Sequence, residues 1–155
     1  MIFTEEYAKE PKRATMGSCG YDIFAPEDLT LVPGEVKMID TGVCLEDSDF
    51  PLIHSVIYEQ GGEPKKVLIA PMEWMLLILP RSSYGTKYGL SFENTASVID
   101  KDYHDSIKLF VKVESDLHIV KGERMAQFII FPHCIFANED IPLAKRTGGI
   151  GSTGR

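Results

Sequence analysis

Arg81 and the hydroxyls of Ser82 and Ser83 form a short polar stretch that directly follows an apolar run. A guanidinium fork matches the geometry of phosphate oxygens, and neighbouring hydroxyls add hydrogen bonds to the same group. A turn whose serines bond their own backbone has the same composition. This stretch therefore indicates either a phosphate-binding loop or a plain turn.

Asp100 is the strongest candidate for a catalytic group, and it lies in the stretch NTASVIDKDY (94–103). A positioned carboxylate can orient a water molecule and draw off its proton. An aspartate followed by Lys101 and Asp102 is also typical of a hydrogen-bonded turn. Asp102 shares a strand face with Asp100 only if the hairpin stays extended, so its role stays open.

The last residues, GGIGSTGR (148–155), contain four glycines and one apolar side chain. Such a segment cannot bury enough surface to order itself alone, which is typical of a frayed end. It is also the composition of a lid whose backbone amides and hydroxyls close on an anion. Both interpretations stand on composition alone.

Short strands must position these groups. Runs rich in Val, Ile, Leu, Phe and Tyr recur between turn residues, and no convincing amphipathic helix exceeds two turns. Over 107–113, apolar residues alternate with Lys108 and Lys112, the period of a half-buried strand. Many short strands without interleaved helices predict an all-β sandwich, jelly roll or barrel.

Length and charge set the class of protein. The chain has 155 residues, 44% apolar and 25% charged, which fits one globular domain. Its net charge of −7 argues against binding to nucleic acid. The longest apolar run, Trp74 to Leu79, is too short for a membrane span, and the acidic start MIFTEEYAKE is unlike a secretory signal. We therefore expect a cytoplasmic protein.

Five stretches resemble, in chain order, the five motifs of the trimeric dUTP pyrophosphatase (dUTPase) family. They are ATMGSCGYDIFA (14–25), PRSSYGTKYGL (80–90), NTASVIDKDY (94–103), GERMAQF (122–128) and RTGGIGSTG (146–154). The resemblance implies a β jelly-roll, or β-clip-like, dUTPase fold that forms a homotrimer with active sites between subunits. We expect residues 1–145 to form the β domain and residues 146–155 to form a flexible lid.

The resemblance also implies the reaction, which is the Mg²⁺-dependent hydrolysis of dUTP to dUMP and pyrophosphate. Asp100 would orient the water that attacks the α-phosphorus, and Asp22 would contact the metal ion through water. Arg124 is expected to serve a structural ion pair. The substrate-binding residues implied in this way are Arg81, Ser82, Ser83, Asn94, Val98, Ile99, Tyr103, Lys108, Gln127, Arg146, Ile150, Gly151, Ser152 and Thr153.

Each group has an implied part. Asn94 and the hairpin backbone near Val98, Ile99 and Lys108 would read uracil, and the Tyr103 ring would lie beneath the deoxyribose. Arg81, Ser82, Ser83 and Gln127 would hold the triphosphate. In the tail, Arg146 would clamp the terminal phosphate, Ile150 would cover the base, and the segment 151–153 would line the phosphates.

The chain departs from the family pattern at five places, one of which is His104-Asp105, where Arg-Gly is common. Ile150 replaces the usual aromatic residue, and only Thr147 separates Arg146 from the glycine pair. Ser97 replaces glycine, which matters if that position requires positive φ. The segment 46–79 is longer than in compact members, as expected of a surface insertion or of a site for a protein partner.

Two other functions compete with this interpretation. A dCTP deaminase resembles dUTPases in fold but needs a carboxylate near C4 of the base. The matching position here is Phe110, which cannot relay a proton. A non-catalytic jelly-roll module that binds a nucleotide or a protein is the second alternative, and it would have no need of Asp100.

Overall fold

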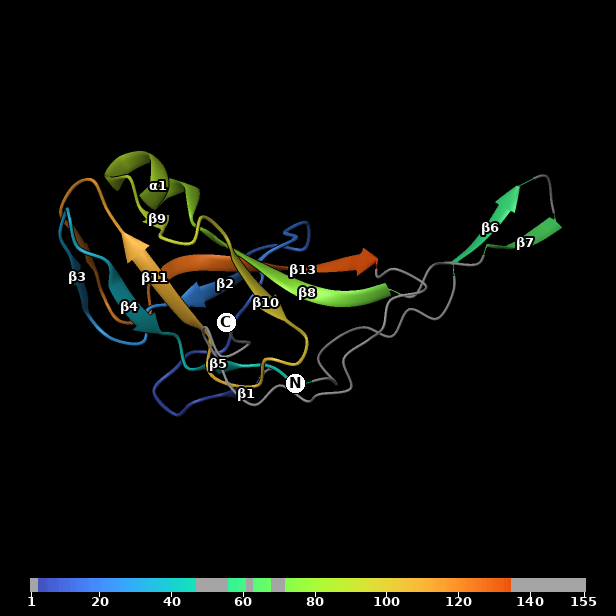
Figure 1. Ribbon diagram of the computed structural model, residues 1–155, viewed down its shortest axis with the longest axis horizontal. Helices are drawn as coiled ribbons and strands as arrows, with labels where there is room; N and C mark the ends of the chain where they lie inside the picture. Colours follow the sequence, from blue (N-terminus) through green and yellow to red (C-terminus); the bar gives the residue numbers. More distant parts are fainter. Residues whose placement is uncertain (1–2, 47–55, 61–62, 68–71, 135–155) are drawn as a thin grey trace, which may run out of the picture.

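The computed structural model of the chain describes residues 3–46, 56–60, 63–67 and 72–134. Antiparallel strands make up nearly all of the regular structure, and the described residues contain one short helix (Figure 1). The prediction of an all-β fold is therefore confirmed.

A four-stranded antiparallel sheet runs through the middle of the molecule. Its order is β10 (Ser97–Asp100), β8 (Met72–Pro80), β13 (Arg124–Cys134) and β2 (Tyr21–Phe24). The β13–β2 register shifts between Arg124 and Ala126, as at a β-bulge. A bulge redirects the side chains next to it, and bulges are common near functional sites.

A second sheet has the order β4 (Lys37–Asp40), β11 (Lys108–Lys112) and β9 (Ser91–Phe92). Its central strand alternates as the sequence predicts, with Leu109 and Val111 buried. The residues that alternate with these two, at 108, 110 and 112, therefore lie on the opposite face of the sheet.

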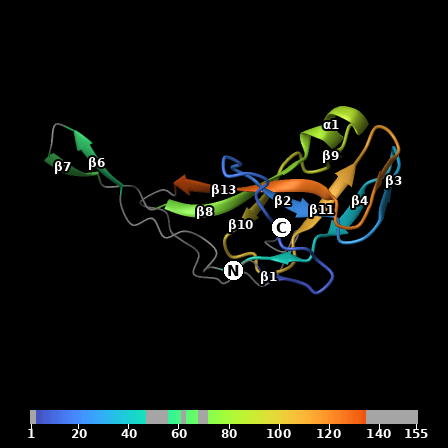
Figure 2. The ribbon, with the colours of Figure 1, turned by 180° about the vertical axis from the view of Figure 1, so that it is seen from behind.

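Three smaller pairs complete the fold. Strand β12 (Leu117–Ile119) pairs with β3 (Leu29–Leu31), and β1 (Phe3–Thr4) pairs with β5 (Val43–Cys44). The long segment expected between the first two motifs contains a hairpin of its own. In this hairpin β6 (Val56–Gln60) pairs with β7 (Glu63–Val67), and it lies at the far end of the molecule from the helix (Figures 1 and 2).

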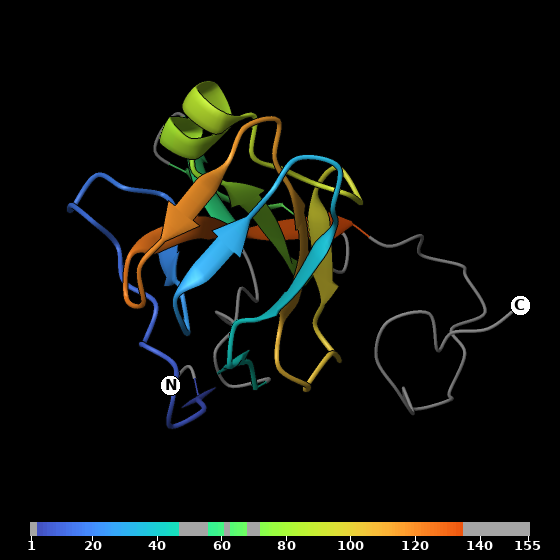
Figure 3. The same cartoon turned by 90° about the vertical axis from the view of Figure 1, so that its left-hand side faces the viewer.

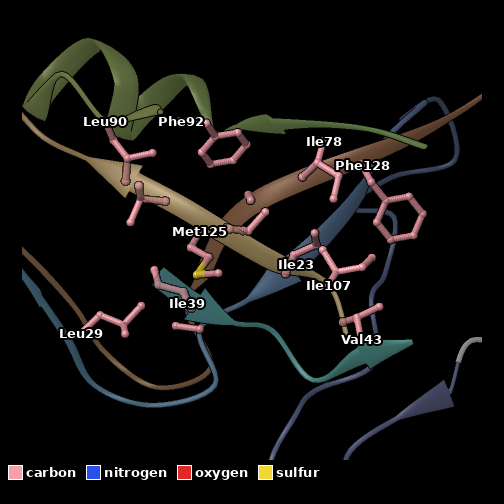
Figure 4. Packing of buried hydrophobic residues seen from close by; sticks show 14 of the residues in the cluster. Ile23, Leu29, Ile39, Val43, Ile78, Leu90, Phe92, Ile107, Met125 and Phe128 are labelled. Atoms are coloured by element: carbon pink, nitrogen blue, oxygen red, sulfur yellow. The ribbon is translucent and has the colours of Figure 1, made fainter. Parts of the chain in front are cut away.

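The hydrophobic core lies between the two larger sheets (Figure 4). Phe128, Ile23 and Ile78 of the four-stranded sheet and Leu109 of the three-stranded sheet are completely buried, as is Ile107 just before β11. Each side chain of this size contributes about 1.5–3 kcal/mol when it leaves water, so this packing fixes the relative position of the sheets.

Helix α1 (Ser82–Tyr88) was not predicted from the sequence. It is seven residues long and buries no residue completely, so its sequence carries only a weak amphipathic signal. Gly89 ends it with φ of 64°, and a Cβ there would lie 2.5 Å from the Glu114 side chain. Figure 3 shows α1 at one edge of the strands.

Among the described residues, no helix is long and apolar enough to cross a membrane.

Candidate active site

Eight residues line a pocket between the segment 94–103 and the outer face of β11. We call it the hairpin pocket after the hairpin that the sequence predicts here, but that prediction is wrong, because β10 pairs with β8 and β11 pairs with β4 and β9. The volume of the pocket is about 160 Å³. A cavity of about 150 Å³ accepts a benzene ring, so this one has room for a single pyrimidine. Its lining residues are Asn94, Ser97, Val98, Ile99, Asp100, Tyr103, Lys108 and Phe110.

Six of these eight residues were candidates from the sequence, and the structure brings them together. They are Asn94, Val98, Ile99, Asp100, Tyr103 and Lys108. Sequence reasoning did not include Ser97 and Phe110 among the site residues. Strand alternation is a signal for Phe110, because residues 108 and 110 share a face of β11.

Strand β10 positions the near wall of the pocket. It pairs with β8 so that Ser97 is opposite Ile78 and Asp100 is opposite Met75. Ser97 is buried with 2% of its surface exposed, whereas Val98 is 52% exposed. The chain then turns back, and the Tyr103 backbone N–H donates to the Asp100 carbonyl at 3.1 Å. This short turn holds Asp100 and the tyrosine beside the same pocket.

A hydrogen-bonded network anchors Tyr103 from behind. Its hydroxyl donates to the Ser106 carbonyl at 3.0 Å, and the Ser106 hydroxyl donates to Asp40 Oδ1. Asp40 also accepts from the Gly42 N–H at 3.1 Å and the Tyr7 hydroxyl at 3.4 Å. Burial raises the pKa of Asp40, but hydrogen bonds from Ser106 and Gly42 outweigh burial and leave this pKa below its ordinary value. Sequence reasoning missed Asp40, because its partner Ser106 is 66 positions away.

Backbone strain in the segment 94–103 lies at Thr95 and not at Ser97. Thr95 is the one non-glycine residue with positive φ, 67°, among the described residues. Ser97 lies within β10 in extended conformation. The replacement of glycine by serine at 97 therefore adds a buried hydroxyl to an unstrained strand.

A second group of polar side chains, the arginine–aspartate cluster, is centred on Asp22 of β2. Asp22 Oδ1 lies 4.0 Å from Arg81 Nε, and Asp22 Oδ2 lies 3.4 Å from Arg124 Nη1. Arg81 Nη1 also donates to the Arg124 carbonyl at 3.2 Å. The ion pair expected for Arg124 is thus present. Asp22 is the least exposed of the three, with 13% of its side-chain surface accessible.

Gln127 belongs to the same cluster through the sheet register, because it lies opposite Asp22 in the β13–β2 pair. Gly20 leaves the space for it, since a Cβ at position 20 would lie 2.7 Å from Gln127 Oε1. Sequence reasoning missed this use of Gly20.

Ser82 and Ser83 form the first turn of α1, directly after Arg81. Helix α1 is tied to the start of β13 by the Tyr84 hydroxyl, which donates to Glu123 Oε2 at 3.4 Å. Burial, followed by the charge of Glu123, raises the pKa of Tyr84, so this donor stays protonated. The helix thereby keeps the two serines next to the cluster.

The hairpin pocket and the arginine–aspartate cluster lie far apart on one chain. Asp22 and Asp100 are on the outer strands of the four-stranded sheet, three strand spacings or about 14 Å apart across it. Strand β13 gives the distance along the sheet. Asp22 is opposite Gln127 of β13, whereas Asp100 is opposite Met75 of β8, which is itself opposite Phe131 of β13. Gln127 and Phe131 are four residues, or about 13 Å, apart. The backbone positions of Asp22 and Asp100 are therefore roughly 20 Å apart.

The described residues hold no group of three or more His, Cys, Asp or Glu side chains able to bind a metal ion. Asp22 is the carboxylate of the cluster, and two arginines already engage it. This donor set fits Mg²⁺ that arrives on a phosphate ligand and keeps most of its water, and does not fit a metal held by a protein cage.

Five predicted site residues lie outside the described residues, namely Arg146, Ile150, Gly151, Ser152 and Thr153. The proposed boundary between a β domain and a lid at residue 146 lies outside them as well.

The fold and the two groups of polar residues define a class: an antiparallel β protein with a ring-sized pocket and a separate arginine cluster. The dUTPase family model matches residues 64–154 of this chain. The deoxyuridine 5'-triphosphate nucleotidohydrolase of Lactococcus lactis is 35% identical over 153 residues, covering 93% of this chain and 87% of that protein. The enzyme of the same name from Thiobacillus denitrificans is 32% identical, covering 94% and 90%. The chain belongs to the dUTPase family.

Solved structures agree on the fold. The dUTPase of Staphylococcus bacteriophage 80alpha, determined with dUpNHpp, matches with a TM-score of 0.67 at 21% identity, covering 100% of this chain and 98% of that one. A mutant dUTPase of phage phi11 of S. aureus, whose structure describes coordination of a structural Mg(II) ion, matches with a TM-score of 0.64 at 20% identity, covering 95% and 97%.

Proposed function

We propose that this protein hydrolyses dUTP to dUMP and pyrophosphate with Mg²⁺. Its membership of the dUTPase family and the name of its relatives, deoxyuridine 5'-triphosphate nucleotidohydrolase, support this reaction. The observation that carries the proposal is the hairpin pocket, because a candidate water-activating carboxylate and the candidate base-reading residues line one ring-sized cavity.

In this proposal the segment 94–103, together with Lys108, reads the base. Uracil presents one N–H donor between two carbonyl acceptors, which a strand backbone and one side-chain amide can match. Asn94 and the backbone near Val98, Ile99 and Lys108 fill these roles. The Tyr103 ring is fixed through its hydroxyl, and it packs beneath the deoxyribose so that a 2′-hydroxyl has no room. A base without the matching edge leaves polar groups unpaired, which costs affinity.

Asp100 performs the catalytic step. Its carboxylate accepts a hydrogen bond from a water molecule, orients it toward the α-phosphorus and takes its proton during attack. The water oxygen forms a bond to the α-phosphorus while the bond from that phosphorus to the bridging β-oxygen breaks. Pyrophosphate leaves in line with the attacking oxygen, and dUMP stays in the pocket.

The arginine–aspartate cluster holds the phosphates. Arg81 offers a guanidinium fork, Ser82 and Ser83 offer hydroxyls, and the Gln127 amide donates to a phosphate oxygen. Bound Mg²⁺ would neutralise phosphate charge, with Asp22 contacting its water shell. The tail completes the site in this proposal: Arg146 clamps the terminal phosphate, Ile150 covers uracil, and Gly151, Ser152 and Thr153 line the phosphates.

The separation between the two groups favours active sites shared between subunits, and the family resemblance implies that these subunits form a homotrimer. A nucleotide whose base lies in the hairpin pocket must bring its α-phosphate to Asp100 and its phosphates to Arg81. Roughly 20 Å between Asp22 and Asp100 prevents one chain from doing both. We therefore propose that each active site combines the hairpin pocket of one subunit with the arginine–aspartate cluster of another.

The protein acts in the cytoplasm, and the 46–79 insertion offers a surface for a protein partner.

The two alternative functions are less well supported. Phe110 lines the hairpin pocket where a dCTP deaminase would require a proton-relaying carboxylate. A binding module without catalysis would leave Asp100 without a task at the edge of that pocket.

The test is pyrophosphate release from dUTP, dTTP, dCTP and UTP with Mg²⁺, for the native chain and for Asp100→Asn. We expect cleavage of dUTP alone, and a loss of about 10²- to 10⁴-fold in kcat for the variant. Ammonia release from dCTP would establish the deaminase instead. Absence of turnover with every nucleotide would leave the binding module.

A further inference from the structure

Ser97 carries a buried hydroxyl at the wall of the hairpin pocket. Only 2% of the residue is exposed, and it lines the pocket together with Asn94. A buried hydroxyl without a partner costs free energy, so its proton must find an acceptor. That acceptor is Asn94 Oδ1, 3.3 Å from Ser97 Oγ.

The direction of this hydrogen bond follows from the chemistry of the two groups. A hydroxyl has one proton, and an amide has an accepting oxygen at one end and an NH₂ donor at the other. If Ser97 Oγ accepted from the Asn94 amide, its own proton would need another acceptor. Among the described residues Ser97 Oγ has no hydrogen bond other than the one to Asn94. The hydroxyl is therefore the donor, and Asn94 Oδ1 is occupied.

The turn before β10 fixes the backbone at Asn94. The Thr95 N–H donates to the Phe92 carbonyl at 3.0 Å, and the Ala96 N–H donates to the Asn94 carbonyl at 2.8 Å. The hydrogen bond from Ser97 is the one that holds the Asn94 side chain among the described residues, and the two ends of its terminal amide are nearly equal in size. Without Ser97, the amide can present either its oxygen or its NH₂ to a ligand.

We propose that Ser97 is a positioning residue that sets base selectivity. By occupying Asn94 Oδ1 it turns the amide NH₂ toward the base, where this donor favours the 4-carbonyl of uracil over the 4-amino group of cytosine. The inference rests on the proposed function for the identity of the base. It assigns selectivity to a residue that does not itself contact the base edge.

The test is a double-mutant cycle on ligand affinity. Binding of dUMP and of dCMP is measured by titration calorimetry without Mg²⁺ for the native chain, Ser97→Ala, Asn94→Ala and the double variant. We expect Ser97→Ala to weaken dUMP binding about 2- to 10-fold while dCMP binding stays equal or tightens. In the Asn94→Ala background the same change should alter dUMP affinity less than about 2-fold.

Two controls separate positioning from packing. Ser97→Cys keeps a side-chain donor, although a weaker one on a larger atom, so its dUMP affinity should fall between those of the native chain and Ser97→Ala. Thermal unfolding reports whether any variant has lost its fold. Equal losses for dUMP and dCMP in both backgrounds would overturn the proposal, because a packing defect does not distinguish the bases.

The outcome is separable from that of the proposed reaction, because the cycle measures binding without turnover. Coupling between Ser97 and Asn94 in a chain that releases no pyrophosphate would support this inference and overturn the hydrolase. Selective dUTP cleavage without coupling between Ser97 and Asn94 would support the hydrolase and overturn this inference. A native chain that binds neither dUMP nor dCMP would overturn the inference directly.

Discussion

The hairpin pocket is built from residues close together in the chain, Asn94 to Phe110, whereas the arginine–aspartate cluster draws on β2, the start of α1 and β13. A turn and a short strand carry most of the pocket residues, and local hydrogen bonds contribute to its shape together with the pairing of β10 with β8. The cluster exists only because distant strands pair in one register. The chain therefore builds a ring-sized pocket and a charged cluster at two separate places and in two different ways.

The two regions also differ in electrostatics. Asp22 lies between two guanidinium groups, so the three side chains carry a net charge of 2 − 1 = +1 in a chain whose net charge is −7. The aspartate holds both arginines in place without cancelling them. A local positive site of this kind attracts an anion that the rest of the molecule repels.

The largest expected effect tests whether the two regions act across subunits. Asp100→Asn and Arg81→Ala chains should each lose most of their activity, and mixed trimers purified through two different tags should regain part of it. One site in three then combines intact groups from two neighbours, which predicts about a third of native activity. Pyrophosphate release measures it. Trimers mixed from Asp100→Asn and Asp100→Ala chains should regain nothing, and equal inactivity of both mixtures would place each site within one chain.

The next effect compares the two arginines of the cluster. Arg81→Ala should lower kcat/KM for dUTP about 10- to 100-fold, the range for losing a hydrogen bond to a charged group. Arg124→Ala is the matched control, since its side chain is 44% exposed against 28% for Arg81 and it pairs with the same aspartate. Its loss should be smaller. Deoxyuridine lacks phosphates, so both variants should bind it with native affinity. A larger loss of kcat/KM for Arg124→Ala than for Arg81→Ala would contradict the roles assigned to the two arginines.

Asp40 supports the hairpin pocket from behind, and its loss should be felt mainly in stability. Asp40→Asn should cost about 1 kcal/mol of unfolding free energy at neutral pH. Because folding lowers the pKa of Asp40, its contribution is complete above the ordinary aspartate pKa and disappears as the pH falls through the lower folded value. The native chain should therefore lose stability as the pH falls below about 5, and the variant should lose less. Urea unfolding over this pH range measures the stability of the native chain and of Asp40→Asn. The control is Asp116→Asn, at an exposed position. If the stability of the native chain and of Asp40→Asn changed in parallel with pH, Asp40 would not contribute through this hydrogen-bonded network.

The sequence predicts the hairpin pocket better than the cluster because the pocket is local. Asn94, Asp100 and Tyr103 lie in one contiguous motif, and the alternation after Ile107 predicts which face of β11 closes the cavity. Asp40 could not be found in the same way, since its hydrogen bond to Ser106 depends on tertiary packing.

The fold shows the same limit. Alternation and turn residues predict strands, but they do not predict which strands pair, and the roughly 20 Å between Asp22 and Asp100 is a property of strand order. Helix α1 escaped prediction because its partly buried tyrosines, Tyr84 and Tyr88, are its contact with the core. The ion pair of Arg124 was predicted correctly, although the second arginine on Asp22 was not.

Gly20 gives the smallest and most selective test of the cluster. Its substitution by alanine would bring a Cβ to 2.7 Å from Gln127 Oε1, so the amide must rotate away from its position opposite Asp22. The displaced atom is the end of a flexible side chain, so stability should change by less than about 1 kcal/mol. The KM for dUTP should rise about 2- to 3-fold, the lower end for losing one neutral hydrogen bond.

The neighbouring glycine provides the matched control. A Cβ at Gly17 would have no atom within 4 Å, so Gly17→Ala should leave KM unchanged. If Gly20 acts through Gln127, then Gly20→Ala should add nothing in a Gln127→Ala background, because the amide it displaces is already gone. An additive loss in the double variant would mean that the new methyl group disturbs the backbone of β13, whose Phe128 carbonyl lies 3.5 Å from the same position. The cluster would then depend on strand spacing and not on the Gln127 amide.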